Sequence, residues 1–214
     1  VGVKGETING IGVEGDSEYI GVYGSGIVGV HGYGSYGVKG EGTVYDFYAD
    51  GSGTNYGPFT GAHEVFLSDD TPEDIAPGML VSATGEVKTR DGSISSTAPT
   101  VRLSNIENDR SIFGVYVLPT TIQDDRWLAP WKEKRTAAVN ALGEGRVLVT
   151  DINGELKLGD WITSSTVPGY GMKQDDDLLH NYTVAKVTEK VDWSKVPGKK
   201  KHKKYLIACI YVCG

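Results

Sequence analysis

The chain has 214 residues but only two cysteines, two methionines and eight prolines, and it lacks a long apolar run. Its longest strongly apolar stretch is residues 205–212, whereas a helix that crosses a bilayer needs roughly 20 such residues. No stretch of about twelve residues carries the apolar stripe of an amphipathic helix. Glycine does not recur at every third position, which excludes a collagen-like chain. These absences argue against membrane insertion and against a helical domain.

An excess of positive charge is also missing. The 28 acidic residues outnumber the 21 basic ones and give a net charge of -7, which argues against a general nucleic-acid-binding face. Simple disorder is disfavoured as well, because twelve tyrosines, four tryptophans and 39% hydrophobic residues can build a buried core. We expect no specific nucleic-acid partner and no cofactor.

The two cysteines, Cys209 and Cys213, lie four residues apart in an alternating apolar segment. On one regular strand they face the same side, about 13 Å apart, which is too far for them to form a disulfide with each other. The spacing therefore predicts two reduced thiols that face a core, as in a protein assembled inside a cell. Pairing between copies of an oligomer is the alternative.

Glycine is abundant and unevenly placed, with 17 of the 30 glycines in residues 1–57. A Gly-Val-x-Gly unit occurs five times there, with starts 10, 9, 8 and 8 residues apart. Each unit fits one short β segment, in which valine points inward and the x residue faces water. The predicted inward residues are Val3, Val13, Val22, Val30 and Val38.

A segment of this length cannot be stable alone. Either the chain coils on itself as a solenoid, or three copies wind round one axis and share their valines. The small buried residue and the short interval favour a trimeric β-shaft over residues 1–42, in which glycine allows three backbones to approach closely. A flexible glycine-rich linker is the simpler alternative, but the regular valine and the absence of a serine-rich composition argue against it.

Residues 43–58 are expected to be a connector, and residues 59–214 an all-β head. Turn signals separate strand-like runs at residues 78–83, 112–117, 146–150, 182–188 and 205–212. Asn153-Gly154 predicts a hairpin. Two stretches share the layout of turn, strand, excursion and return strand, which predicts one small β-barrel or sandwich made of two interlocked halves.

The run from Asn153 to Ser165, with Pro168-Gly169-Tyr170-Gly171-Met172-Lys173 after it, resembles the C-terminal β-domains of bacteriophage tail fibres and tail appendages. The Gly-Val-x-Gly array resembles the shaft repeats of phage and virus fibres, and Phe59-Thr60-Gly61-Ala62-His63-Glu64 resembles the opening of fibre tips. The resemblance implies a homotrimeric virion fibre whose tip starts trimerisation, contacts the host, or both. Some relatives are intramolecular chaperones that cleave themselves off after assembly.

Self-cleavage needs a nucleophile and a base, and the densest set of suitable side chains is His63, Glu64, Ser68 and Asp69. A histidine beside carboxylates can act as a general base toward a serine or a water molecule. The pair His63-Glu64 lacks the second histidine of a zinc-protease helix. The simpler interpretation is that these are polar loop residues with hydrogen-bond partners, so we assign none of them as catalytic.

Further charged and aromatic clusters are candidates for binding. Asp175, Asp176 and Asp177 offer oxygens of the kind that Ca²⁺ prefers, but they lack the spaced pattern of a calcium loop. Residues 194–204 hold six lysines, which suit an anionic glycan or simply a solvated hairpin tip. Three aromatic residues are candidates for a sugar-stacking surface, or else for core and subunit contacts: Trp127, Trp131 and Tyr170.

Together these features predict a structural and adhesive protein: the distal part of a homotrimeric virion fibre, assembled in the host cytoplasm. Its expected partners are copies of itself and a host-surface glycan or protein receptor. Two alternatives are open. One is an autoproteolytic chaperone domain that drives fibre trimerisation, and the other is a cellular surface-fibre or adhesin module.

Overall fold

A computed structural model describes residues 61–89, 97–122, 128–198 and 202–213. The chain divides into two units, Val1–Gly53 and Thr54–Gly214, and every described residue belongs to the second, which we call the body. The predicted shaft, its five valines, the connector and Trp127 lie outside the described residues.

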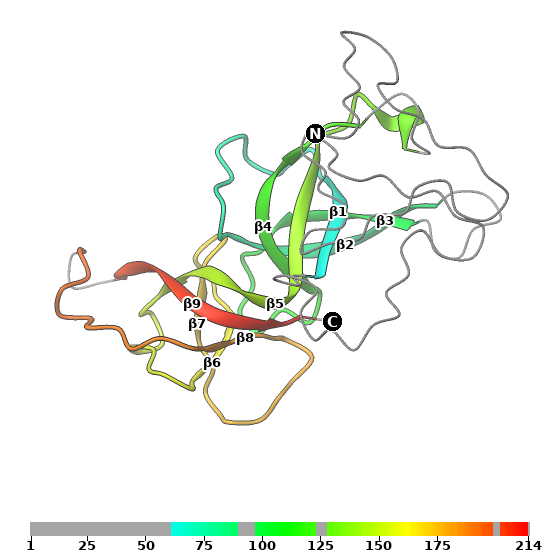
Figure 1. Ribbon diagram of the computed structural model, residues 1–214. Helices are drawn as coiled ribbons and strands as arrows, with labels where there is room; N and C mark the ends of the chain where they lie inside the picture. The colour runs from blue at the N-terminus through cyan, green and yellow to red at the C-terminus, as the bar shows by residue number, and fades with distance from the viewer. Residues whose placement is uncertain (1–60, 90–96, 123–127, 199–201, 214) are drawn as a thin grey trace, which may run out of the picture. The chain divides into compact units, whose positions relative to one another are not determined.

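The body is built from strands (Figure 1). In the described part of the chain, the other regular element is one 3-10 turn, η1 (Ala129–Trp131), and there is no α-helix. The all-β prediction is therefore confirmed. The nine strands are β1 (Gly61–Leu67), β2 (Leu80–Thr89), β3 (Thr97–Leu103), β4 (Ile112–Thr120), β5 (Thr136–Thr150), β6 (Trp161–Ser164), β7 (Gly171–Lys173), β8 (Thr183–Val187) and β9 (Lys204–Val212).

Strand β9 illustrates why these segments form strands. Its side chains alternate along the chain, so that Ile207, Cys209 and Tyr211 are buried whereas Leu206 and Ile210 are exposed. This period of two matches a strand with one face on the core. The other predicted strand runs also fall on observed strands, namely β2, β4, the end of β5, and β8.

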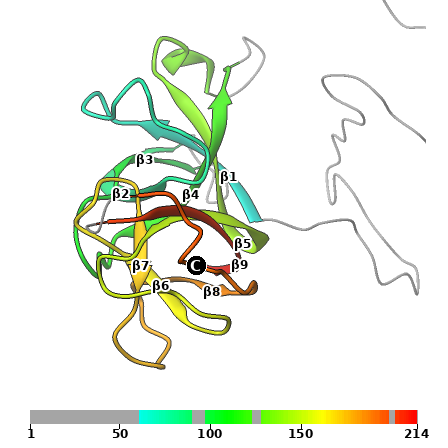
Figure 2. The same cartoon turned by 90° about the vertical axis from the view of Figure 1, so that its left-hand side faces the viewer.

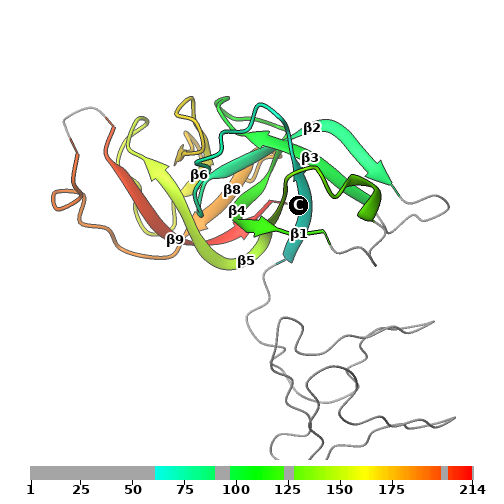
Figure 3. The ribbon, with the colours of Figure 1, turned by 90° about the horizontal axis from the view of Figure 1, so that it is seen from above.

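All nine strands belong to one mixed sheet, in the order β1-β3-β2-β4-β5-β7-β6-β8-β9. Additional pairings join β1 to β5 and β5 to β9. They close two rings of neighbours, β1-β3-β2-β4-β5 and β5-β7-β6-β8-β9, which share the fifteen-residue β5. The first part of β5 pairs with β1 and β4, and the second part pairs with β7 and β9. Figures 2 and 3 show β5 between the two groups of strands.

The two rings repeat the same local structure. The N–H of Gly78 donates to the Tyr116 carbonyl at 2.9 Å, and in the second ring the N–H of Gly159 donates to the Val187 carbonyl at 3.0 Å. These glycines have φ angles of +93° and +91°, which a residue with a side chain rarely adopts. Each glycine precedes a strand that pairs with its return strand, β2 with β4 and β6 with β8. Each of the two predicted strands is thus paired with its return strand.

Most of the buried apolar side chains lie in two clusters. The larger cluster holds residues of the second ring, including Ile162, Val184 and Ile207, and the other lies within the first ring around Val65 and Val101. The larger cluster also includes Leu80 of β2 and Val115 of β4, so it extends from the second ring into the first, whereas the smaller cluster lies within the first ring.

Both cysteines are free and buried, as predicted, Cys209 on the core face of β9 and Cys213 directly after the end of that strand. Burial raises the pKa of each thiol, Cys209 and Cys213, to about 12. The Cys213 thiol donates to the Val184 carbonyl at 3.2 Å. Both thiols therefore remain protonated at neutral pH, and neither is a reactive thiolate.

The hairpin predicted at Asn153-Gly154 is wrong, although the turn is present. The N–H of Gly154 donates to the Asp151 carbonyl at 2.9 Å, and Gly154 has a φ of +95°. The following strand, β6, pairs with β7 and β8 rather than with β5. After the turn the chain runs into the core, because Leu156 is fully buried and its carbonyl accepts a hydrogen bond from the Trp193 indole at 2.8 Å.

Candidate functional site

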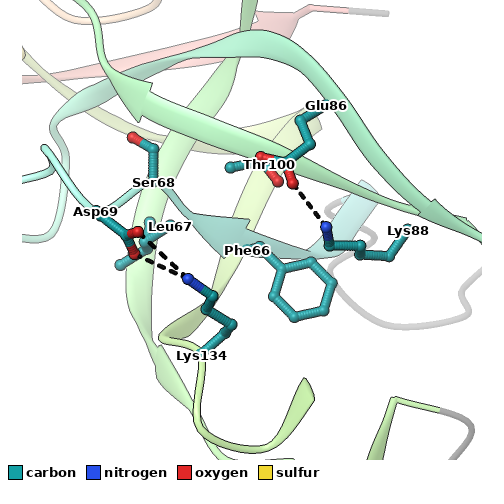
Figure 4. A pocket seen from close by; sticks show the side chains of 8 residues that line it. All are labelled: Phe66, Leu67, Ser68, Asp69, Glu86, Lys88, Thr100 and Lys134. Carbon is teal, nitrogen blue, oxygen red and sulfur yellow. Dashed lines mark hydrogen bonds and ion pairs between the residues drawn. The ribbon is translucent and has the colours of Figure 1, made fainter. Parts of the chain in front are cut away.

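A small polar pocket lies where β1 ends, and it contains two of the predicted site residues (Figure 4). Its volume is about 80 Å³, whereas pockets for small organic ligands usually measure about 300–1,000 Å³. It is therefore of a size for water or a single small group. Its lining side chains are Phe66, Leu67, Ser68, Asp69, Glu86, Lys88, Thr100 and Lys134.

Ser68 follows the last residue of β1 and is held by the neighbouring turn. Its N–H donates to the Val101 carbonyl at 2.8 Å, and its carbonyl accepts from the Thr71 N–H at 2.9 Å. The Ser68 hydroxyl donates to the Asp70 carboxylate and lies 3.0 Å from the Thr71 hydroxyl. These bonds are typical of a serine that stabilises a turn.

The charges around this pocket are paired with one another. Asp69 accepts from Lys134 at 3.3 Å, and Glu86 accepts from Lys88 at 2.6 Å. The hydrogen bond from Lys88 lowers the pKa of Glu86 below its usual value. Since both pairs are partly exposed, each contributes little to stability, and together they leave the pocket without an excess of either charge.

His63 and Glu64 lie toward the opposite end of β1 from Ser68. The His63 ring packs edge-on against Phe113 with centroids 5.7 Å apart, and the Glu64 carboxylate accepts from the Thr120 hydroxyl at 3.1 Å. Five residues of strand separate His63 from Ser68, or roughly 16 Å. The structure therefore does not bring the candidate base to the candidate nucleophile.

The three consecutive aspartates lie in the loop between β7 and β8 and point to different partners. Asp175 accepts from the Asn153 amide at 2.7 Å, and both carboxylate oxygens of Asp176 lie 3.0 Å from the His180 ring. The Asp177 carbonyl accepts from the Trp161 indole at 3.1 Å. Across residues 61–89, 97–122, 128–198 and 202–213, no three histidine, cysteine or acidic side chains converge as metal ligands do.

Sequence reasoning missed the residue that organises this loop, Gln174. It is 4% exposed, and its amide N–H group donates to the carbonyls of Asp176 and Leu178 at 3.1 and 2.7 Å. Its amide oxygen accepts from the Thr183 hydroxyl at 2.7 Å. The only available signal was a polar residue directly after a short strand, which does not distinguish a buried amide from an exposed one.

The other sequence candidates do not form a common surface in the described part of the chain. Trp131 packs edge-on against Phe66 at 6.2 Å, and the Tyr170 ring lies under the Lys204 ammonium at 4.2 Å. Of the predicted lysine loop, Lys195 pairs with Asp192 at 3.0 Å. These contacts are local and hold individual loops to the body.

Comparison with known proteins adds no relative. No protein-family model matches the chain, and a search of curated proteins found no significant similarity. None of the helical segments in the described residues is long and apolar enough to cross a membrane.

Proposed function

We propose that this chain is the distal part of a homotrimeric virion fibre, in which a triple β-helical shaft leads into a barrel-like head. In this proposal the protein belongs to a viral tail fibre or appendage, is assembled in the host cytoplasm and is carried on the virion. The head caps three shaft strands and contacts a host-surface glycan or protein receptor.

The observation that carries the proposal is the array of five Gly-Val-x-Gly units, followed by an all-β body. Units of this length need partner strands to bury their valines, and three copies around one axis supply them. The two closed rings of paired strands support a barrel-like head, because a sheet that closes leaves few exposed edges.

The outer face of β5 and β9 supplies apolar surface for contact between copies. Leu142 is 44% exposed and Ile210 is 41% exposed on these paired strands. Leu142 also pairs with Gly61, the first described residue after the repeat-bearing segment. Exposed apolar side chains on these two paired strands favour an interface between copies.

Light scattering on the full chain tests the proposal, with an expected mass of three times the 22.9 kDa of one chain. A monomer at micromolar concentration overturns it. Intact-mass spectrometry after assembly tests for self-cleavage. The structure gives this alternative little support, because the Ser68 hydroxyl has Asp70 and Thr71 as partners rather than a histidine. An uncut chain excludes the autoproteolytic alternative, and the genes beside its own distinguish a virus from a cellular adhesin.

A further inference from the structure

A second concavity lies in the first half of the body, and its volume of about 340 Å³ is large enough for a small ligand. We call it the β4 cleft, because the end of β4 forms one of its walls. The turn after β1 and the segment before β5 form the others. The lining residues that matter for its chemistry are Ile75, Tyr116, Pro119, Lys132, Lys134 and Arg135.

The β4 cleft is cationic in a chain that is acidic overall. Its lining has three basic side chains and one acidic side chain, Glu73, whereas the whole chain carries a net charge of -7. Because Lys134 also pairs with Asp69 beside the cleft, the local excess is about one positive charge. Arg135 is fixed in place, because its guanidinium donates to the carbonyls of Thr71 and Pro72 at 2.7 and 3.1 Å and pairs with Glu73 at 3.2 Å. The guanidinium is thus held in a fixed orientation, and its anionic partner Glu73 is an exposed side chain that an incoming anionic group can displace.

Tyr116 adds a hydroxyl group to the same cleft. The residue as a whole is 4% exposed, but its hydroxyl oxygen is not one of the buried polar atoms that lack a partner in the described part of the chain. The hydroxyl therefore faces solvent in the cleft, where it can donate to or accept from a ligand beside an apolar wall formed by Ile75 and Pro119.

The second half of the body shows what the same position looks like when it is filled. By strand register, Leu156, Val187 and Tyr205 occupy the places of Ile75, Tyr116 and Arg135. Trp193, 3% exposed, lies against Tyr205 with ring centroids 6.1 Å apart, and its indole donates to the Leu156 carbonyl.

The first half thus keeps the topology but replaces an apolar seal with cations and hydroxyls. Among the described residues of that half, no aromatic side chain takes the place of Trp193 in the cleft lining. A position that is packed shut in one half and open and charged in the other is a candidate for selective binding rather than for packing.

We propose that the β4 cleft binds an anionic saccharide, with its acidic group between Arg135, Lys132 and the Tyr116 hydroxyl and its ring against Ile75 and Pro119. The acidic group is a carboxylate or a phosphate, since a guanidinium suits both. Thr121 also lines the cleft and is exposed, so its hydroxyl complements a sugar hydroxyl. This deepens the proposed function, on which it rests for the choice of a surface saccharide over other anions.

Calorimetric or NMR titration of the full chain tests this site with three probes: glucuronic acid, glucose 6-phosphate and uncharged glucose. We expect one or both acidic sugars to bind in the millimolar range and glucose to bind at least about tenfold more weakly. The stronger of the two acidic probes identifies the carboxylate or the phosphate as the preferred group. Equal affinity for all three overturns the proposal.

Two variants locate the binding. Tyr116→Phe removes only the hydroxyl, and Lys132→Ala removes one cation, so each should weaken binding of the acidic sugar about tenfold. Their matched controls are Tyr182→Phe and Lys195→Ala, which lie outside the cleft and should leave the affinity unchanged. Thermal melting confirms that all four variants are folded. Unchanged affinity in both cleft variants overturns the assignment.

The oligomeric state separates this inference from the proposed function. A trimer that binds none of the three sugars contradicts the β4 cleft site and leaves the fibre proposal standing. A monomer that binds the acidic sugar contradicts the fibre proposal and retains the site. Light scattering on the same samples that are titrated provides this distinction.

Discussion

At the scale of single residues, Gly145 decides how closely β5 and β9 approach. A Cβ atom placed there would lie 2.3 Å from the Tyr211 hydroxyl oxygen and 2.5–2.6 Å from two of its ring carbons. Tyr211 cannot move aside cheaply, because it is 3% exposed and its hydroxyl donates to the Arg146 carbonyl at 2.5 Å. The glycine is therefore required for packing rather than for its backbone freedom.

We predict that Gly145→Ala lowers the free energy of unfolding by about 2 kcal/mol or more, because it forces Tyr211 out of its packed position. Urea unfolding measures the change. Gly154→Ala is the matched control, since its Cβ meets nothing within 4 Å and the cost is limited to its φ of +95°, about 1 kcal/mol. Equal losses in the two variants would contradict a packing role for Gly145.

The buried acids of β9 predict how stability depends on pH. Burial raises the pKa values of Cys209, Cys213 and Tyr211 to about 12 in the folded chain. Because the folded pKa values lie above the unfolded ones, the full stability is present below about pH 9 and is lost as the pH rises from about 9 toward 12.

We expect the urea midpoint to fall between about pH 8 and about pH 10 as the unfolded thiols begin to ionise. Cys213→Ala removes one of these groups, so the same pH change should cost this variant less stability. Dithionitrobenzoate at about pH 8 should modify neither thiol until the chain is unfolded. Rapid modification of the folded chain would be incompatible with two buried thiols.

At the scale of elements, the loop between β7 and β8 depends on one buried amide. Gln174 bonds the loop carbonyls and the Thr183 hydroxyl, while the loop itself exposes Leu178 and Leu179 at 65% and 64%. The backbone N–H of Leu178 and the His180 side chain lower the pKa of Asp176. The loop is thus ordered by polar contacts and has few apolar ones of its own.

Gln174→Met keeps the length of the side chain but removes these bonds, leaving the Thr183 hydroxyl and loop carbonyls without their partner. We expect the free energy of unfolding to fall by about 1–3 kcal/mol, with faster amide hydrogen exchange in residues 175–182. Lys190→Met, at an exposed position, makes the same polar-to-apolar change and should have little effect. If Gln174→Met and Lys190→Met lose the same free energy of unfolding, or if amide exchange in the loop is unchanged in Gln174→Met, Gln174 does not have this role.

Which elements the sequence predicts depends on how local their signals are. β9 can be predicted because its side chains alternate between buried and exposed, and β2 because it begins with an apolar run between Gly78 and Gly85. β3 has Pro99 at its centre, which argues against a strand, and β7 has only three residues, so neither has a signal of its own. β3 and β7 become strands because other strands of the sheet, formed by distant parts of the chain, pair with them.

The same reasoning applies to the candidate sites. The predicted group around Ser68 consists of neighbours in sequence, but β1 is extended and places His63 and Ser68 far apart. The β4 cleft joins Ile75, Tyr116 and Arg135, which are distant in sequence and meet only because β4, β1 and β5 are paired. No local pattern indicates such a site, and only the comparison of the two halves isolates it.

At the scale of the whole molecule, the body is two similar halves joined by one strand. β5 belongs to both rings and contributes side chains to both apolar clusters, so a defect in it affects both, whereas β3 contributes to only one of the two. We therefore expect the two halves of the body to unfold together, as a single transition in urea.

The repeat valines of the proposed shaft can be tested in the assembled fibre. In the proposed trimer Val30 faces the shared axis, so Val30→Asp places three carboxylates in a buried seam where burial of an unpaired charge is costly. Lys39→Asp is the matched control, because it introduces the same side chain at a position predicted to face water. We expect Val30→Asp to lower the melting temperature of the full-length trimer and to raise the fraction of monomer on light scattering, with Lys39→Asp close to wild type. If the two aspartate variants behave alike, the valines do not line a common axis, and the repeats act as a linker instead.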